Sequence, residues 1–332
     1  MAYSQGGLIQ AADYNGFLGT TAASAAAINS IWSTGNGDCG YGQTALGTVS
    51  QAGLVTATQW ASAVNTLNSI KTHQSGSGTG IGAPTAGSLI SYLGTFSSSL
   101  STAYTNRKTF STSGTTTNQS TQANRLTAAN GTAAQTFTIT RTATFASADQ
   151  ARYFFNAGGG IDFVIQNTTT NNNATSRTAD LLTLAVTNLG SYAAFRASTG
   201  GGKSGTGGTV NTLTTTLGYY NLTTSAQTLV KITGTSTPYA GDYIQLDVKS
   251  NGTQGSNADT GTVITFQLTL YSAAQSSYPA PPALPAYTPA GVSPTVNTTT
   301  EDAIDITVKN LLTVTYPETT NLTNTWGTVT LA

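Results

Sequence analysis

The fold is decided by a short stretch in the last third of the chain, ITFQLTL at residues 264–270, in which apolar and polar side chains alternate without a break. A period of two is typical of a strand that buries one face and exposes the other. The segment IQLDV at residues 244–248 repeats the pattern, and glycine-rich turns separate further alternating segments between residues 134 and 272. We therefore predict a two-layer antiparallel β-sandwich over residues 134–274, with a small helix near residues 178–188.

The N-terminal part of the chain follows a helical period instead. Apolar side chains recur three or four residues apart in two segments: Ile28, Ile31 and Trp32, and then Trp60, Val64, Leu67 and Ile70. We predict two amphipathic helices, the second capped by Thr58, with the glycine-rich loop of residues 35–43 between them. Residues 1–75 are expected to form a helical attachment region, and residues 88–104 a further helix. The predicted fold class is α+β and mainly β.

Three segments are predicted to link or extend these parts. Residues 76–133 hold the further helix and a connector, flexible at residues 111–121 because that stretch has no apolar content. The proline-rich residues 275–294 are expected to be an extended spacer. Residues 295–332 alternate like strands but are too few for a core of their own, so we expect this β tail to pair with another domain or subunit. The latter arrangement predicts a homo-oligomer, a trimer or a hexamer.

The composition excludes several classes of function. Lys plus Arg and Asp plus Glu both number 12, so the chain lacks the positive field that nucleic-acid binding needs. One His and one Cys exclude zinc sites of the thiolate or imidazole type and an intrachain disulfide. The sequence shows neither a signal peptide nor an apolar run long enough for a membrane span, so membrane insertion is not expected.

Several sequence motifs resemble binding or catalytic sites, but each is explained better by a structural role than by a functional one. The glycines at positions 35, 37 and 40 match a dinucleotide fingerprint but follow a helix instead of a strand, and GGKS at residues 201–204 lacks the first glycine of a phosphate-binding loop. Glu301, Asp302 and Asp305 are expected on a solvated strand edge, with calcium binding as the alternative. His73 lies beside a Gly/Ser joint with no nucleophile near it, so replacing His73 or Glu301 should cost little. We predict no catalytic, cofactor-binding or metal residue, and no enzyme activity.

One segment is more specific than its composition: YFFNAGG at residues 153–159. It resembles a motif of virion structural proteins from tailed bacteriophages, particularly those that infect cyanobacteria. GYYNLT at residues 218–223 resembles a later element of the same module, and ADYN at 12–15, GYGQ at 40–43 and TATQW at 56–60 are also phage-like. In physical terms, Asp149 is expected to cap a short helix whose aromatic residues plug the sandwich, while Tyr219 and Tyr220 lie in a strand with one ring inward.

The resemblance implies a particle component made in the host cytoplasm and located in the virion. We expect a non-catalytic structural protein of the tail, in a fibre, baseplate or neck, with other virion proteins as partners. Two alternatives stay open: a host-surface adhesin that binds glycans through exposed Tyr, Asn and Thr side chains, and a capsid decoration protein.

Overall fold

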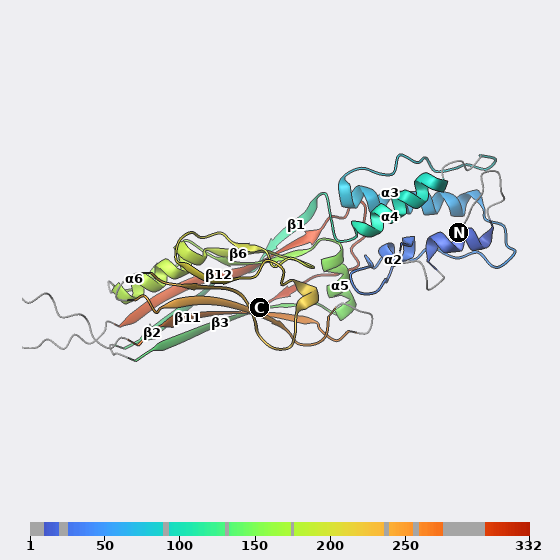
Figure 1. The fold of residues 1–332 in the computed structure, drawn as a ribbon. Coiled ribbons are helices and arrows are strands. Elements are labelled where there is room, and N and C mark those ends of the chain that lie inside the picture. Colours follow the sequence, from blue (N-terminus) through green and yellow to red (C-terminus); the bar gives the residue numbers. More distant parts are fainter. Residues whose placement is uncertain are drawn as a thin grey trace, which may run out of the picture.

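The computed structural model describes residues 10–19, 26–88, 93–129, 133–173, 176–235, 239–254, 259–274 and 303–332. Helices gather at one end of an elongated molecule and two antiparallel sheets form the other end (Figure 1). The predicted fold class, helices followed by an antiparallel sandwich with more strand than helix, is confirmed. The predicted proline-rich spacer at residues 275–294 lies outside the described residues.

Four helices and their connections make up the part that we call the helical lobe. The helices of the lobe are α1 (Ala11–Leu18), α2 (Ile28–Trp32), α3 (Ala57–Ser75) and α4 (Leu93–Thr105). An aromatic cluster holds them together, since the Trp60 ring of α3 lies 5.1 Å from Phe96 of α4 and 6.0 Å from Tyr14 of α1. The cap of α3 is Thr56 and not Thr58, because the Thr56 hydroxyl accepts the Gln59 N–H in a reciprocal capping box.

The first sheet has seven strands in the order β1-β12-β4-β6-β7, with β2 and β5 also paired to β12. Its strands are β1 (Ser113–Asn118), β2 (Gln122–Ala128), β4 (Gly160–Ile165), β5 (Thr170–Asn171), β6 (Ser191–Phe195), β7 (Gly202–Lys203) and β12 (Ile304–Pro317). The long strand β12 has β1 and β2 along one edge and β4 and β5 along the other. It is therefore the central strand of this sheet.

The position of β12 corrects the prediction of a separate C-terminal tail. Residues 304–317 pair with four strands of their own chain, and Ile306, Val308 and Leu312 are fully buried. The core that these residues could not build alone is supplied by the rest of the sandwich. Pairing with another part of the same chain is thus confirmed, and the reason given above for a homo-oligomer falls away, while the homo-oligomer itself stays a prediction.

The predicted flexible connector at residues 111–121 is also wrong. Strand β1 lies within it and is hydrogen-bonded to β12, with Thr116 opposite Thr315 and Thr117 opposite Val314. Threonine is β-branched and suits an extended backbone, so an edge strand forms here without apolar side chains of its own.

The second sheet has six strands in the order β13-β3-β11-β10-β9-β8. Its strands are β3 (Gln135–Thr144), β8 (Thr209–Leu213), β9 (Gln227–Thr233), β10 (Tyr243–Ser250), β11 (Val263–Ser272) and β13 (Thr330–Leu331). The alternation at residues 264–270 is that of β11, whose Ile264, Phe266 and Leu268 are at most 1% exposed. The strand prediction at this stretch is confirmed.

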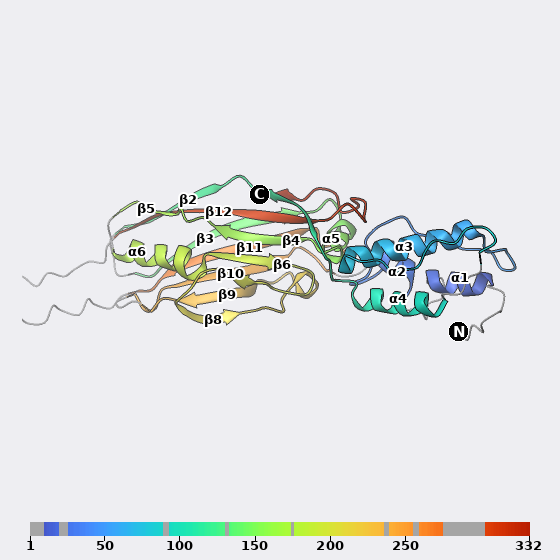
Figure 2. The same ribbon diagram turned by 90° about the horizontal axis from the view of Figure 1, so that it is seen from above.

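The two sheets face each other across an aromatic core. The Phe266 ring of the second sheet lies 5.6 Å from Phe195 and 6.5 Å from Phe163, both of the first sheet. Helix α6 (Ser176–Leu182) contacts strands of both sheets, and the π-helical turn η1 (Thr183–Leu189) contacts β9 and β10 of the second sheet. Figure 2 shows α6 lying along the sandwich. The helix predicted near residues 178–188 is thus present.

Helix α5 (Ala148–Asn156) lies at the end of the sandwich that meets the helical lobe (Figure 2). Its Phe155 stacks on Tyr219 with ring centres 4.4 Å apart, so the predicted aromatic plug is present. The cap is Ser147 instead of Asp149, because the Ser147 hydroxyl accepts the Gln150 N–H at 3.1 Å. Tyr219 begins a short 3-10 turn, η2 (Tyr219–Asn221), so the predicted strand at this point is wrong.

Candidate functional site

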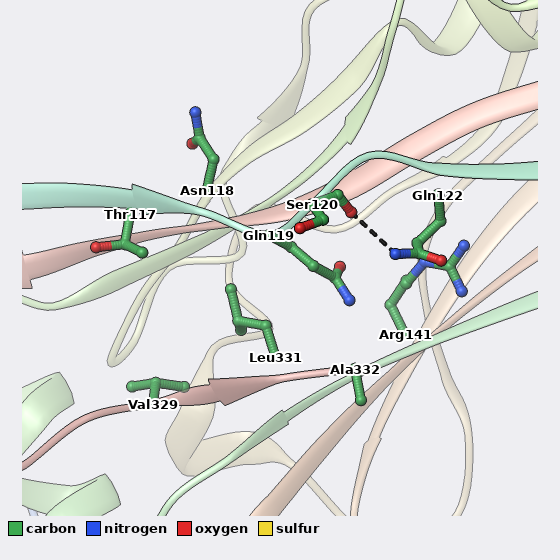
Figure 3. A pocket seen from close by; sticks show the side chains of 9 residues that line it. All are labelled: Thr117, Asn118, Gln119, Ser120, Gln122, Arg141, Val329, Leu331 and Ala332. Carbon is green, nitrogen blue, oxygen red and sulfur yellow. Dashed lines mark hydrogen bonds between the residues drawn. The ribbon is translucent and has the colours of Figure 1, made fainter.

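Two hollows lie along the open edge of the sandwich, between β1 of the first sheet and the C-terminal segment of residues 324–332. We call them together the edge groove. The first hollow has a volume of about 440 Å³ and is lined by Thr117, Asn118, Gln119, Ser120, Gln122, Arg141, Val329, Leu331 and Ala332 (Figure 3). The second has a volume of about 630 Å³ and includes Thr112, Ser113, Thr115, Thr320, Asn324 and Trp326 in its lining. Thr117 lines both, so the two hollows meet there.

The groove exists because the two sheets are not covered at this edge. Strand β13 pairs only with the last two residues of β3, Ala143 and Thr144. Ala332 continues this pairing by exchanging two backbone hydrogen bonds with Thr142, and among the described residues no strand pairs with the outer edge of β3 before that point. The turn between β1 and β2 passes over the uncovered part of β3, and the space between them is the first hollow (Figure 3).

Arg141 occupies an inward position of β3, on the same face as Ile139 and Ala143. Only 8% of its surface is exposed. Its Nη2 donates to Oδ1 of Asn124 on β2 at 2.6 Å, and its Nη1 donates to the Thr140 carbonyl at 2.7 Å. Asn124 also accepts a hydrogen bond from the buried Asn310 of β12. The guanidinium therefore links the two sheets through neutral acceptors.

The charge of Arg141 has no counter-ion among the described residues. Arg107, Arg125 and Arg152 each lie within 3.0 Å of a carboxylate oxygen, whereas no such pair involves Arg141. Its Nε is buried and has no hydrogen-bond partner in the described structure. Burial lowers the pKa of Arg141, because the charged form is desolvated. The first hollow thus borders a buried cation that forms no ion pair with a described side chain, and the C-terminal residue Ala332 lines the same hollow.

The glycine-rich loop of residues 35–43 forms the junction between the helical lobe and the sandwich. Arg152 of α5 donates to the Cys39 carbonyl at 2.8 Å, and Asn156 of α5 donates to the Gly40 carbonyl at 3.1 Å. Gly40 has a φ of +103°, and a Cβ there would lie 2.3 Å from the Thr34 carbonyl oxygen. The glycines therefore serve a tight loop, as the sequence context predicted, and the loop docks on α5.

His73 is also at the junction, whereas the expected small cost of replacing it assumed that it is exposed. It is fully buried, and its Nδ1 lies 2.9 Å from Oε1 of Glu318. Burial lowers the pKa of His73, so the ring is neutral at pH 7 and donates its Nδ1 hydrogen to the carboxylate. Burial also tends to raise the pKa of Glu318, but hydrogen bonds from His73, Asn321 and Thr320 outweigh it and lower that pKa. This pair is a structural contact between α3 and the segment after β12.

The remaining candidates from the sequence fall into structural roles or outside the described residues. Lys203 of the GGKS segment donates to the carbonyls of Asn188 and Gly205. Asp305 lies in β12 beside Arg125 at 2.6 Å, not on an edge strand, while Glu301 and Asp302 lie outside the described residues. Within the described ranges, no group of three His, Cys, Asp or Glu side chains could hold a metal ion, and no helix is long and apolar enough to cross a membrane.

Sequence reasoning missed Arg141, although a signal for it was present. In FTITRTAT at residues 137–144, the inward positions of the alternating strand are Phe137, Ile139, Arg141 and Ala143. A single arginine at an inward position of a strand is unusual, because a fully buried arginine needs partners.

The comparisons with known proteins add no identity, since no family model, curated protein or solved structure matches this chain.

Proposed function

We propose that this protein is a non-enzymatic structural component of a tailed-phage particle, in which the helical lobe docks on a neighbouring virion protein and the sandwich extends outward. The observation that carries the proposal is where the phage-like segments lie. Three of them, GYGQ at 40–43, YFFNAGG at 153–159 and GYYNLT at 218–223, come from distant parts of the sequence and meet at the junction between the lobes.

Their contacts are of the architectural kind. Asn156 of the second segment donates to the Gly40 carbonyl of the first and accepts a hydrogen bond from the Tyr220 hydroxyl of the third. A Cβ at Gly42 would lie 2.4 Å from the ring of Tyr153, so the first segment closes directly on the second. Because the side chains of these three segments bond to and pack against one another, the contacts support a role for the segments in holding the two lobes at a fixed angle.

The free end of the helical lobe supports docking there. The C-terminal end of α3 is at the junction, through His73, so its N-terminal end is roughly 28 Å away at 1.5 Å per residue. Leu54 precedes that end and is 84% exposed, on a turn where Ala52 has a φ of +61°. A left-handed alanine is strained, and such strain persists where the structure fixes a functional conformation. The turn presents Leu54 to a partner.

Incorporation of the full-length chain into particles tests the proposal. We expect Leu54→Asp to fold normally, because the residue is exposed, and to be depleted from purified virions. Val210→Asp is the matched control, since Val210 is 43% exposed on strand β8 of the sandwich. Normal incorporation of Leu54→Asp would contradict docking through this end of the lobe.

A second function, binding of glycans on the host surface, is favoured by the edge groove. Its lining is rich in hydroxyl and amide groups, which suit the hydroxyl groups of saccharides, and it lies on the sandwich, whereas Leu54 precedes the N-terminal end of α3 in the helical lobe. A structural protein of the tail can carry such a site without any catalytic group.

A further inference from the structure

We propose that the first hollow of the edge groove binds an acidic saccharide, with the carboxylate of the sugar on the Arg141 guanidinium. The inference rests on the proposed function in one respect, namely that the sandwich is the part of the protein that faces the host. It goes beyond that function by naming a ligand class and the residue that selects it.

The guanidinium of Arg141 carries a positive charge that no ion pair among the described residues balances. Arg141 is more than nine-tenths buried, lines the hollow, and makes its hydrogen bonds only to neutral acceptors. Its Nε hydrogen has no acceptor in the described structure. A buried cation is costly unless an anion accompanies it, so this site gains more from an anionic ligand than an exposed arginine would.

The number and arrangement of donors in the first hollow favour a carboxylate as the anion. A guanidinium presents paired N–H groups that match the two oxygens of a carboxylate. Among the described residues, Arg141 is the one basic side chain in the lining of the first hollow, and no helix begins there to add further N–H donors. One positive charge suits a singly charged carboxylate better than a phosphate group, which usually collects several donors.

The other side chains that line the first hollow suit the rest of the ligand. Gln119, Ser120 and Gln122 lie on the side of the hollow near Arg141 and offer hydroxyl and amide groups that can both donate and accept hydrogen bonds, while Thr117 lies farther along β1 (Figure 3). A volume of about 440 Å³ is enough for a small ligand such as one or two sugar units. The second hollow continues past Thr117 with hydroxyl and amide groups and one carboxylate, that of Glu318, in its lining, so a longer chain has room to extend along β1.

The alternative is that Arg141 only links the two sheets. It does bridge β3 to β2 through Asn124, and a purely structural role predicts that no anion recognises it. The two explanations differ in binding, which can be measured on the purified full-length protein without any virion. The outcome is therefore independent of whether the chain is incorporated into particles.

The experiment compares glucuronic acid with glucose, which differ by the carboxylate, using ligand-observed NMR on the full-length protein. We expect glucuronic acid to bind at least about tenfold more tightly than glucose, the ratio that a 1.4 kcal/mol difference gives. The variant Arg141→Gln should abolish this preference. Arg125→Gln, which changes an exposed arginine already paired with Asp305, should leave it intact.

A second variant tests the same site without changing Arg141, so the test does not depend on whether Arg141→Gln folds. Ser120 is exposed at the mouth of the hollow, so Ser120→Trp should fill the space, keep the melting temperature and abolish binding of glucuronic acid. Equal binding of glucuronic acid by the wild type and Ser120→Trp would overturn the proposed site. Absence of glucuronic acid binding to the wild type, or tighter binding of inorganic phosphate, would overturn the proposed ligand class.

Discussion

Acidification should weaken the junction between the helical lobe and the sandwich, through the single histidine of the chain. His73 is buried and neutral in the folded protein, and burial holds its pKa below the ordinary value of 6.5. When the pH falls below that value, the unfolded chain takes up a proton at His73 and the folded chain does not. Stability therefore decreases with falling pH, and it does so until the pH reaches the folded pKa of His73.

The magnitude follows from the exchange of one proton. The free energy of unfolding should fall by up to about 1.4 kcal/mol per pH unit once the pH is below the ordinary pKa of histidine. Glu318 adds a second loss of the same sign at lower pH, because its folded pKa also lies below its ordinary value of 4.5. The two losses are separated on the pH axis, so the first belongs to His73.

Urea unfolding at a series of pH values between about 7.5 and 5 measures the slope directly. The matched variant is His73→Gln, whose amide can still donate to Glu318 but does not titrate, and it should show a flat profile in this range. A stability that rises on acidification would refute the reasoning, because it would mean that the folded state prefers a protonated His73 and that the pair with Glu318 is a salt bridge.

The other predictions concern the junction and the caps. Gly40→Ala should destabilise the protein clearly, because the new Cβ would meet the Thr34 carbonyl and the φ of Gly40 is positive, whereas Gly47→Ala, with nothing within 4 Å, should be close to neutral in urea unfolding. Phe155→Ala should cost about 3 to 5 kcal/mol in the same assay, since the ring is fully buried against Tyr219; a cost below about 1 kcal/mol would argue against the aromatic plug. Thr56→Ala should cost about 0.5 to 2 kcal/mol through loss of the α3 cap, and an unchanged stability would contradict that cap.

Much of the fold was predictable because its signals are local. The alternation at residues 264–270 and 244–248 is a property of a strand with one buried face, and it appears in the structure as β11 and β10. The period of Trp60, Val64, Leu67 and Ile70 is likewise that of one helix, α3, which buries all four.

The errors in predicting the fold arose where a segment depends on distant partners. The Thr-rich residues 113–118 have no apolar pattern, and they form β1 only because β12 supplies hydrogen bonds from about 200 positions further along the chain. The C-terminal residues 304–317 read as an incomplete tail because their neighbours, β2 and β4, cannot be identified from sequence spacing. Pairing between strands that are far apart in the sequence produces no pattern that a short stretch of sequence can reveal.

The candidate site was missed for a related reason. Arg141 stands out only once the strand register places it inward and its hydrogen bonds among the described residues are seen to go to neutral acceptors. His73 was judged from its Gly- and Ser-rich neighbours in the sequence, whereas the structure packs its ring against Tyr41 and pairs it with Glu318, which lies 245 positions away. Burial and charge pairing are properties of the assembled lobes.

The most direct measurement of the central claim is immunogold labelling of intact phage particles with antibodies raised against the purified full-length chain. We expect label at a defined position on the tail, with epitopes on the sandwich accessible and those around Leu54 covered until the particles are dissociated. Particles that carry no label before or after dissociation, while the free protein is recognised in the same preparation of infected cells, would contradict the assignment to the virion.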